Sequence, residues 1–577
     1  MSAQASTLIF LCAALVAAVP LVTMPAAGQA QAAAPAPGRT VLDLQGAHPS
    51  ESVSLGGAAG PRGSLTLTHL NPAANAWLLL TLQAPGSHAA VAYHLENAAP
   101  STQRIGLDPA RPGQLTLVAG DGTARCTLWP GGALELARRS VLPYAPLCEG
   151  RLYLRNAVYG NRSSLEATTE FLRDQVWRGE KIIGFVRREF YRDAFAEHGT
   201  SASAAHSDAG RAAPTGAPPA ARMQSAGAQR TLTAAGLGID LGVEGGLVPG
   251  QWYGAAGLDG VYVSITQPGA LSAGVAQRRP LDGVEADALA YLVAFDLAAF
   301  DLAFALGTEH PRLGWSQHMR DELRDLRLPG PDGIDNTAPL VRTGMVSPAL
   351  QARTVATFTG GFKREHGAFL HGDLAAVNRG SHYGFIEQGV VFSTLMPGLA
   401  TLFVLNDGST EMKTWSHHDD RLLDQIRHAR QNGVPLIERD PGGGPSRFGT
   451  LVDQWGAGNW SGSADEQLRT LRAGTCLVEQ ANQRFLVYGY FSSATPRAMA
   501  HVFQAYGCRY AMHLDMNALE HTYLALYPRS GSRIGVEHLV QGMAVLDKSV
   551  GATLVPRFLG FADDRDFFYL LRREDKR

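Results

Sequence analysis

Short apolar runs separated by Gly, Pro and Asn fill the first part of the chain. Four of them are bounded by turn residues and have the length of strands, at 64–68, 77–82, 89–95 and 114–118. Such runs are typical of β-strands joined by tight turns. We therefore expect residues 41–150 to form a β-rich, sandwich-like unit.

The spacing of apolar residues changes after residue 150. Large apolar side chains recur at near-helical spacing among charged residues, which predicts a helical connector over 151–195. Residues 196–230 are rich in Ala, Ser, Gly and Pro and contain almost no large apolar side chain. Such a segment cannot offset the entropy lost on ordering, so we expect a disordered linker there.

Strand and helix patterns alternate from residue 231 to the end of the chain. Strands are predicted at 260–265, 300–306, 402–405, 412–415, 475–479, 485–489 and 510–514. Helices are predicted at 421–431 and 495–506, the second with Pro496 in its first turn and Gly507 after its end. We therefore expect a larger mixed α/β domain over 231–577, which makes the fold class α+β.

The first forty residues have the pattern of a secretory signal peptide followed by a short tail. An apolar run from Leu8 to Val22 precedes small residues that suit a signal peptidase, although no Lys or Arg comes before the run. Pro20 interrupts this run, and no later segment has the length that a bilayer span needs. We expect a secreted or periplasmic protein with no membrane span in the mature chain.

Four cysteines remain once Cys12 leaves with the signal peptide. The simplest pairing is Cys126 with Cys148 and Cys476 with Cys508, although three pairings are formally allowed and four reduced thiols are an alternative. Each bridge would contribute roughly 3 kcal/mol by the loop-entropy model. No Cys/His spacing indicates zinc, so neither a metal nor a cofactor is predicted.

The charges of the chain nearly cancel. Lys plus Arg number 50 and Asp plus Glu number 52, a formal net charge of −2. A chain without a global positive field is not drawn to nucleic acid, so we expect no nucleic-acid partner.

The strand predicted at 510–514 ends in a group of polar residues. Asp515 and Asn517 follow this strand directly, and polar groups on rigidly held connections are frequent catalytic positions. The alternative is that Asp515 caps the following turn, which is a common role for Asp and Asn.

Three segments together resemble the phosphodiester glycosidase family. Leu514-Asp515 is similar to the start of the family's Leu-Asp-Gly-Gly-Gly-Ser motif, with Met516, Asn517 and Ala518 in place of glycines. Thr359-Gly360-Gly361-Phe362 is similar to its Asn-Gly-Gly-Phe element, with Thr359 replacing Asn. Arg472 matches the family arginine at a strand start, and the order of the segments fits over roughly residues 250–560.

The resemblance implies hydrolysis of the bond between a sugar's anomeric carbon and a phosphate. Arg472 would bind the phosphate through its guanidinium fork. Asp515 would act as acid/base or nucleophile. Glu438 and Asp440 are the candidates for a second carboxylate, with a surface turn as the alternative. The further substrate-binding candidates for a carbohydrate or glycosyl phosphate are Thr359, Gly360, Gly361, His513 and Asn517.

Two other functions are open at this point. A catalytically silent module that binds polysaccharide or a surface partner is expected if Met516 fills the space that glycines would leave. A two-carboxylate glycosidase would need a second acid near Asp515. Glu520 and His521 would reach the same pocket if the chain turns back after Asp515.

Overall fold

The computed structural model describes most of residues 39–574. The exceptions are 57–61, 130–131, 164–166, 168–192, 204–213, 225–229, 273–279, 316–320, 364–381, 453–468 and the single positions 47, 88, 121, 532 and 552. The predicted signal peptide and most of the predicted helical connector therefore lie outside the described residues. In the described part of the chain, no helix combines the length and apolar character that a membrane crossing needs.

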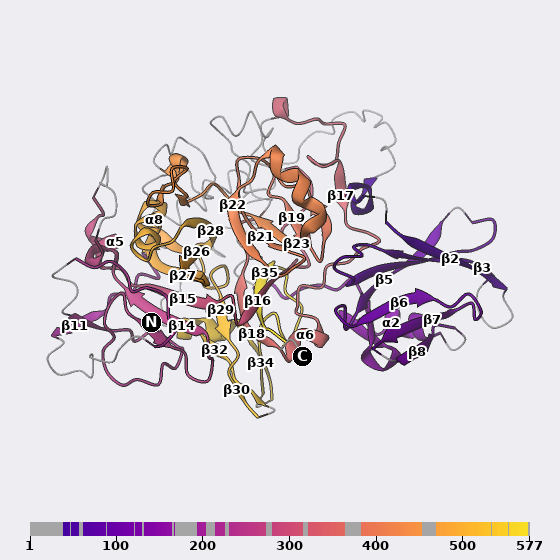
Figure 1. The fold of residues 1–577 in the computed structure, drawn as a ribbon, viewed down its shortest axis with the longest axis horizontal. Helices are drawn as coiled ribbons and strands as arrows, with labels where there is room; N and C mark the ends of the chain where they lie inside the picture. The colour runs from indigo at the N-terminus through magenta and orange to yellow at the C-terminus, as the bar shows by residue number, and fades with distance from the viewer. Residues whose placement is uncertain are drawn as a thin grey trace, which may run out of the picture. The chain divides into compact units, whose positions relative to one another are not determined.

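Two antiparallel sheets form the N-terminal part of the chain (Figure 1, indigo to purple). The six-stranded sheet has the order β2 (Ser50–Gly56), β3 (Arg62–His69), β4 (Trp77–Gln83), β5 (Ala90–Asn97), β10 (Leu152–Arg155), β9 (Tyr144–Leu147). The three-stranded sheet contains β6 (Gln103–Leu107), β7 (Gln114–Ala119) and β8 (Gly122–Thr127). Leucines of both sheets share one core with helix α2 (Ala133–Arg139), because alternate strand positions face inward.

The largest sheet of the C-terminal part has eight strands, and several of them are labelled in Figure 1. Its order is β13 (Trp252–Gly254), β14 (Val261–Thr266), β15 (Ala290–Asp296), β27 (Gln483–Ala494), β26 (Thr470–Gln480), β28 (Tyr510–Met516), β24 (Ile437–Glu438), β25 (Arg447–Phe448). Every neighbouring pair is antiparallel. β28 is buried along its whole length, and its residues before Asp515 are apolar apart from His513.

Two five-stranded sheets complete the larger architecture. One has the order β16 (Phe300–Ala305), β35 (Phe567–Arg572), β18 (Thr354–Thr359), β29 (Leu524–Leu526), β32 (Glu537–His538). The other has the order β20 (Val390–Ser393), β19 (Phe385–Glu387), β23 (Ile426–Gln431), β21 (Ala400–Leu405), β22 (Thr410–Thr414). All their pairings are antiparallel.

The remaining elements are short. Two-stranded pairs join β1 (Arg39–Thr40) to β17 (Ile334–Asn336), β11 (Thr200–Ser203) to β12 (Arg230–Thr233), β30 (Arg529–Ser530) to β31 (Arg533–Ile534) and β33 (Lys548–Val550) to β34 (Thr553–Val555). The other α-helices are α5 (Gly283–Asp287), α6 (Pro348–Gln351) and α8 (Pro496–Ala505). The 3-10 helices are η1 (Val41–Leu44), η2 (Cys148–Gly150), η5 (Pro268–Ala270), η6 (Asp321–Leu323), η8 (His417–Gln425), η9 (Thr450–Val452) and η10 (Gln541–Leu546).

The expected α+β class with a large mixed α/β domain is wrong. The large sheets are antiparallel throughout, and the longest α-helix of the described residues, α8, has ten residues. The predicted helix at 421–431 is wrong in its second half: residues 421–425 lie in the 3-10 helix η8, whereas residues 426–431 form strand β23. Both faces of this strand are buried, including Arg430 and Gln431, so its sequence lacks the alternation that marks a half-exposed strand.

Part of the predicted linker at 196–230 is ordered. β11 pairs with β12, and residues 214–224 make backbone hydrogen bonds to the rest of the chain, including Ala221 N to Gly250 O at 2.9 Å. Arg222 donates through Nη2 to the carbonyl of Gln504 at 2.7 Å. Each of these hydrogen bonds is accepted by a main-chain carbonyl, which composition does not reveal. The domain boundaries proposed from the sequence stay predictions.

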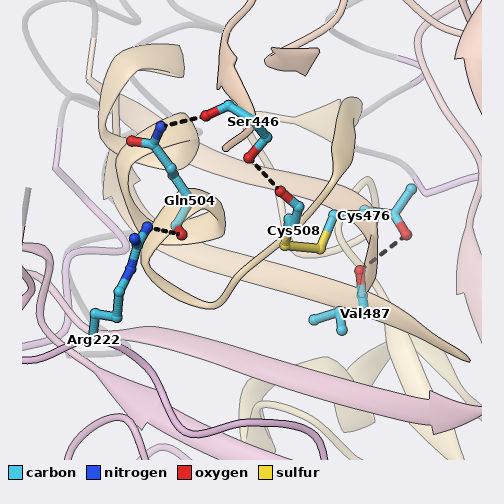
Figure 2. Close-up of a disulfide and its surroundings, with 7 residues drawn as sticks. Arg222, Ser446, Cys476, Val487, Gln504 and Cys508 are labelled. Carbon is cyan, nitrogen blue, oxygen red and sulfur yellow. Dashed lines mark hydrogen bonds between the residues drawn. A yellow bond between two sulfur atoms is a disulfide. The ribbon is translucent and has the colours of Figure 1, made fainter. Parts of the chain in front are cut away.

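The two disulfides predicted as the simplest pairing are present. Cys126 bonds to Cys148, and Cys476 of β26 bonds to Cys508, which precedes β28. Figure 2 shows Ser446 beside the second bridge, donating to the carbonyl of Cys508 at 2.7 Å and accepting from Gln504 at 2.8 Å. The bridge therefore anchors the approach to the strand that carries Asp515.

We expect replacement of both Cys476 and Cys508 by Ala to lower the free energy of unfolding by about 3 kcal/mol. The bridge closes a loop with a sequence separation of 32, which restricts the unfolded chain. Urea unfolding of both proteins measures the loss. The matched control replaces Cys126 and Cys148, whose separation of 22 gives a similar loss without touching β28. An unchanged unfolding midpoint would contradict the expectation.

A buried group of charges lies where β5 and β10 meet β19. Arg155 is 3.4 Å from Glu96 and 3.8 Å from Glu387, and its guanidinium lies over the ring of Trp77. Burial raises the pKa of Glu387 to about 7, against the opposing effect of Arg155. The folded state therefore holds the Glu387 proton at pH values where the unfolded state has released it.

This raised pKa predicts a fall in stability with rising pH. Between about pH 4.5 and 7 the folded state binds more protons than the unfolded state. The contribution of Glu387 to the free energy of unfolding therefore falls by about 3 kcal/mol across that window. Glu387→Gln cannot ionise, so its unfolding free energy should lack this fall. Urea unfolding at pH 5 and pH 8 measures the difference, with Glu149→Gln, an exposed position, as the control. If the unfolding free energies of wild type and Glu387→Gln change in parallel with pH, the prediction is contradicted.

Candidate functional site

Asp515 lies near the end of β28 with both carboxylate oxygens engaged. Arg565 donates from Nη1 to Oδ2 at 2.5 Å, and the backbone N–H of Met516 donates to Oδ1 at 2.8 Å. Asp515 is 6% exposed and Arg565 is 2% exposed, so this ion pair is almost completely buried. A guanidinium at this distance favours the ionised form of a carboxylic acid.

His521 extends this arrangement on the other side of Arg565. Its Nδ1 is 2.7 Å from the carbonyl of Met516, and its Nε2 is 2.8 Å from Nη2 of Arg565. A carbonyl only accepts and a guanidinium only donates, so we assign the proton to Nδ1 and a neutral ring to His521. Glu520 lies 3.5 Å from the same ring. The chain turns back after Asp515, as the alternative from the sequence required.

The Gly-Gly-Phe element approaches the same place from the end of β18. Thr359 donates through its N–H to Tyr523 and through its hydroxyl to the carbonyl of Glu520. A Cβ at Gly360 would lie 2.4 Å from Oδ2 of Asp566, and one at Gly361 would lie 2.8 Å from the amide of Asn432. Both glycines are therefore required by close packing rather than by backbone conformation.

Asn432 ties this element to β28. Its Oδ1 accepts from the N–H of Phe362 at 3.0 Å. Its Nδ2 donates to the carbonyls of His513 and Leu514 at 2.9 and 3.1 Å. The side chain is fully buried, so Asn432 holds the Gly-Gly-Phe element against the strand that carries Asp515.

Arg472 lies on β26 opposite Met516 and is fully buried. It donates from Nε to the carbonyl of Ala494 at 2.8 Å, and its Nη1 contacts the sulfur of Met516 at 3.2 Å. Burial lowers the pKa of Arg472 to about 9, although Glu285 opposes the shift. Met516 therefore covers the guanidinium that the resemblance assigns to phosphate binding.

His513 and Asn517 lie on either side of Asp515 along the chain. Burial, with a contribution from Arg472, lowers the pKa of His513 well below its ordinary value, and its ring packs at 5.9 Å from that of Phe362. Asn517 has a φ of 79°, in the left-handed region that Asn tolerates better than most residues. Asn517 thus forms the turn at a position where the family has glycine.

Glu438 is not brought together with Asp515. It lies on β24, whose neighbour Ile437 pairs with Ala511 near the start of β28. At about 3.4 Å per residue, the five residues from Tyr510 to Asp515 span about 17 Å. Paired glycosidase carboxylates are separated by roughly 5–9.5 Å. Asp515 therefore lies beside Arg565, and Arg472 contacts the neighbouring Met516, whereas Glu438 lines a depression at the other end of β28.

Arg565, Asp566, Arg430 and Asn432 are site residues that the sequence interpretation did not identify. One signal was available: Asp563-Asp564-Arg565-Asp566 is a run of four charges directly before an apolar strand, and all four are buried. Within the described part of the chain, no group of three or more His, Cys, Asp or Glu side chains could hold a metal ion.

Comparisons with known proteins give only distant structural likenesses. No family model and no curated protein matches the chain. The zebrafish N-acetylglucosamine-1-phosphodiester alpha-N-acetylglucosaminidase catalytic domain, auto-inhibited by its pro-peptide, is 10% identical with a TM-score of 0.30, covering 67% of this chain and 99% of that chain. A hypothetical protein from Synechocystis is 9% identical with a TM-score of 0.25, covering 90% and 98%. Scores at this level do not establish a common fold.

Proposed function

We propose that this chain is an exported hydrolase that cleaves a glycosyl phosphodiester in envelope or extracellular polysaccharide. The observation that carries the proposal is the ion pair of Asp515 with Arg565, beside His521 and the Gly-Gly-Phe element. The segments that resemble the phosphodiester glycosidases thus lie next to a carboxylate and a cation of the kind this reaction needs. The signal-peptide pattern and the two disulfides support export.

The contacts of Asp515 disfavour the acid role among the roles proposed for it. Because Arg565 stabilises the carboxylate, Asp515 is available as a general base or nucleophile rather than as an acid. As a base it would take a proton from water while the water oxygen bonds to the anomeric carbon. The bond from that carbon to the phosphate oxygen breaks, and its electron pair leaves with the phosphate. The products are a free sugar and a phosphomonoester.

The cation for the phosphate would be Arg565 in this arrangement. Its guanidinium already spans Asp515 and His521, and a guanidinium fork matches phosphate oxygens. Arg472 would join it only after Met516 moves from the contact at 3.2 Å. Thr359, Gly360 and Gly361 would shape the opposite wall, with His513 and Asn517 supporting β28 and its turn.

The test is incubation of the full-length protein with a panel of sugar-1-phosphodiesters, followed by phosphorus NMR. The reaction is run in water labelled with a heavy oxygen isotope. Attack at the anomeric carbon leaves an unlabelled phosphate on the aglycone, whereas attack at phosphorus gives either sugar 1-phosphate or a phosphate that carries the label, which shifts its phosphorus signal. We expect the first set of products. Sugar 1-phosphate as the product, or no turnover of any panel member, would contradict the proposal.

A second candidate is the catalytically silent binding module, favoured by the contact of Met516 with Arg472. In that case the wild-type protein would bind members of the panel without turnover. Met516→Gly would uncover the Arg472 guanidinium. Binding that is strengthened by this substitution, with turnover still absent, is the result that would establish the silent module.

A further inference from the structure

A depression of about 580 Å³ opens at the start of β28, at the end remote from Asp515. We call it the Tyr510 pocket and define it by Phe403, Met412, Lys413, Glu438, Arg447 and Tyr510. Its volume lies within the range of roughly 300–1,000 Å³ of small-molecule sites. None of these residues takes part in the contacts around Asp515.

The floor of the Tyr510 pocket is apolar and fixed. Tyr510, Phe403 and Met412 are each at most 3% exposed, so only a small part of each side chain faces the pocket. The hydroxyl groups of Tyr510 and Thr414 are hydrogen bonded at 2.9 Å. A floor of this kind can contact the C–H face of a ring without rearranging.

Cations surround this floor. Lys413 is held by Asp419 at 2.6 Å and Arg439 by Glu479 at 3.1 Å, and both side chains remain 44% exposed. Arg447 on β25 pairs with Glu438 through its backbone, but its exposed side chain makes no hydrogen bond or ion pair with the described residues. Its five N–H donors are therefore available to an anionic ligand group.

Two carboxylates complete the lining. Glu438 accepts through Oε2 from the N–H and hydroxyl of Thr450 at 3.3 and 3.1 Å, which fixes the orientation of the carboxylate. Glu411 is held by Arg484 at 3.1 Å. Carboxylates fixed in this way can accept hydrogen bonds from ligand hydroxyl groups, which a simple anion would not offer.

We propose that the Tyr510 pocket binds a saccharide that carries an anionic group, either a carboxylate or a phosphate. The apolar floor suits the C–H face of a sugar ring, the carboxylates suit its hydroxyls, and Arg447 with Lys413 and Arg439 suits the anion. The pocket lies about 17 Å along β28 from Asp515, so this binding is separate from the proposed hydrolysis.

The experiment is calorimetric titration of the full-length protein with three tetrasaccharides of equal length. One is neutral, one is a tetramer of galacturonic acid, and one is the neutral tetramer with a single phosphate. We expect at least one anionic tetramer to bind tenfold or more tightly than the neutral one. Arg447→Ala should weaken that binding fivefold or more, and Arg447→Lys should weaken it less.

Arg533→Ala is the matched control, because Arg533 is exposed on β31 outside the pocket. It should leave the affinity within twofold. Because Arg447 takes no part in the contacts around Asp515, a loss of affinity in Arg447→Ala assigns the binding to the Tyr510 pocket and not to the proposed active site. Equal binding of neutral and anionic tetramers, absence of binding, or equal losses from Arg447→Ala and Arg533→Ala would overturn the proposal. Preference for the phosphate or for the carboxylate tetramer identifies the anion.

Discussion

Asp515→Asn should lower turnover of a cleaved sugar-1-phosphodiester by about 10²-fold or more and leave substrate affinity within a few fold. The amide oxygen of Asn can still accept from Arg565 or from the N–H of Met516, so the shape of the site is kept. What is lost is the group that takes the proton or attacks the anomeric carbon. Single-turnover kinetics and a separate binding measurement distinguish the two quantities.

The control for this substitution is Asp440→Asn. Asp440 accepts from the N–H of Gly444 in a surface turn, so the same chemical change there should leave turnover unchanged. Urea unfolding of Asp515→Asn is needed alongside, because Arg565 loses a charged partner. Asp515→Asn with near wild-type turnover would remove Asp515 from the mechanism. Equal losses in turnover and affinity would assign it a binding role instead.

Asp566→Ala should lower the free energy of unfolding by about 3–5 kcal/mol. Arg430 is fully buried, with Nε 2.8 Å from Asp566 and its other nitrogens donating to Gln431 and Phe362 at 2.6 Å. Removal of the carboxylate leaves a buried cation without its charged partner. Urea unfolding at neutral pH measures the loss.

The matched control is Asp325→Ala. Asp325 pairs with Arg327 at 2.8 Å, but the Arg327 side chain is 88% exposed, so this loss should be much smaller than that of Asp566→Ala. Replacing Arg430 by Met together with Asp566 by Leu should recover part of the stability lost in Asp566→Ala, because no unpaired charge remains. Similar losses for Asp566→Ala and Asp325→Ala would show that burial of Arg430 does not decide the effect.

Local signals in the sequence identified the elements with clear boundaries. Helix α8 has Pro496 in its first turn and Thr495 accepting from Ala498 as its N-cap, and the chain around it was predicted correctly. The paired strands β26 and β27 and the strand leading to Asp515 were also found, because each is a strongly apolar run between turn residues. The antiparallel order of the large sheets was missed, since it depends on pairings between distant segments.

The residues of the candidate site also divide into those that a local sequence pattern marks and those whose role depends on a distant partner. Asp515 and Gly360–Gly361 stand out in the sequence because polar residues and glycines next to buried strands are unusual. Arg565 and Asn432 do not, because their roles come from partners 50 and 81 residues away, Asp515 and His513. Glu438 stood out equally well, yet it lies at the opposite end of β28. One strand can position polar residues at both of its ends, and its sequence alone does not separate them.

The bridge between Cys476 and Cys508 changes the topology of the chain around β28. Without it, Cys476 and its strand partner Ala511 are separated by 35 residues of backbone that include β27 and α8. With it, the covalent path runs across the sulfurs and three residues further to Ala511. Loop closure over so short a path costs little entropy, so β28 pairs with β26 as a near neighbour. In the oxidised chain, the strand that carries Asp515 therefore has the low effective contact order of a hairpin.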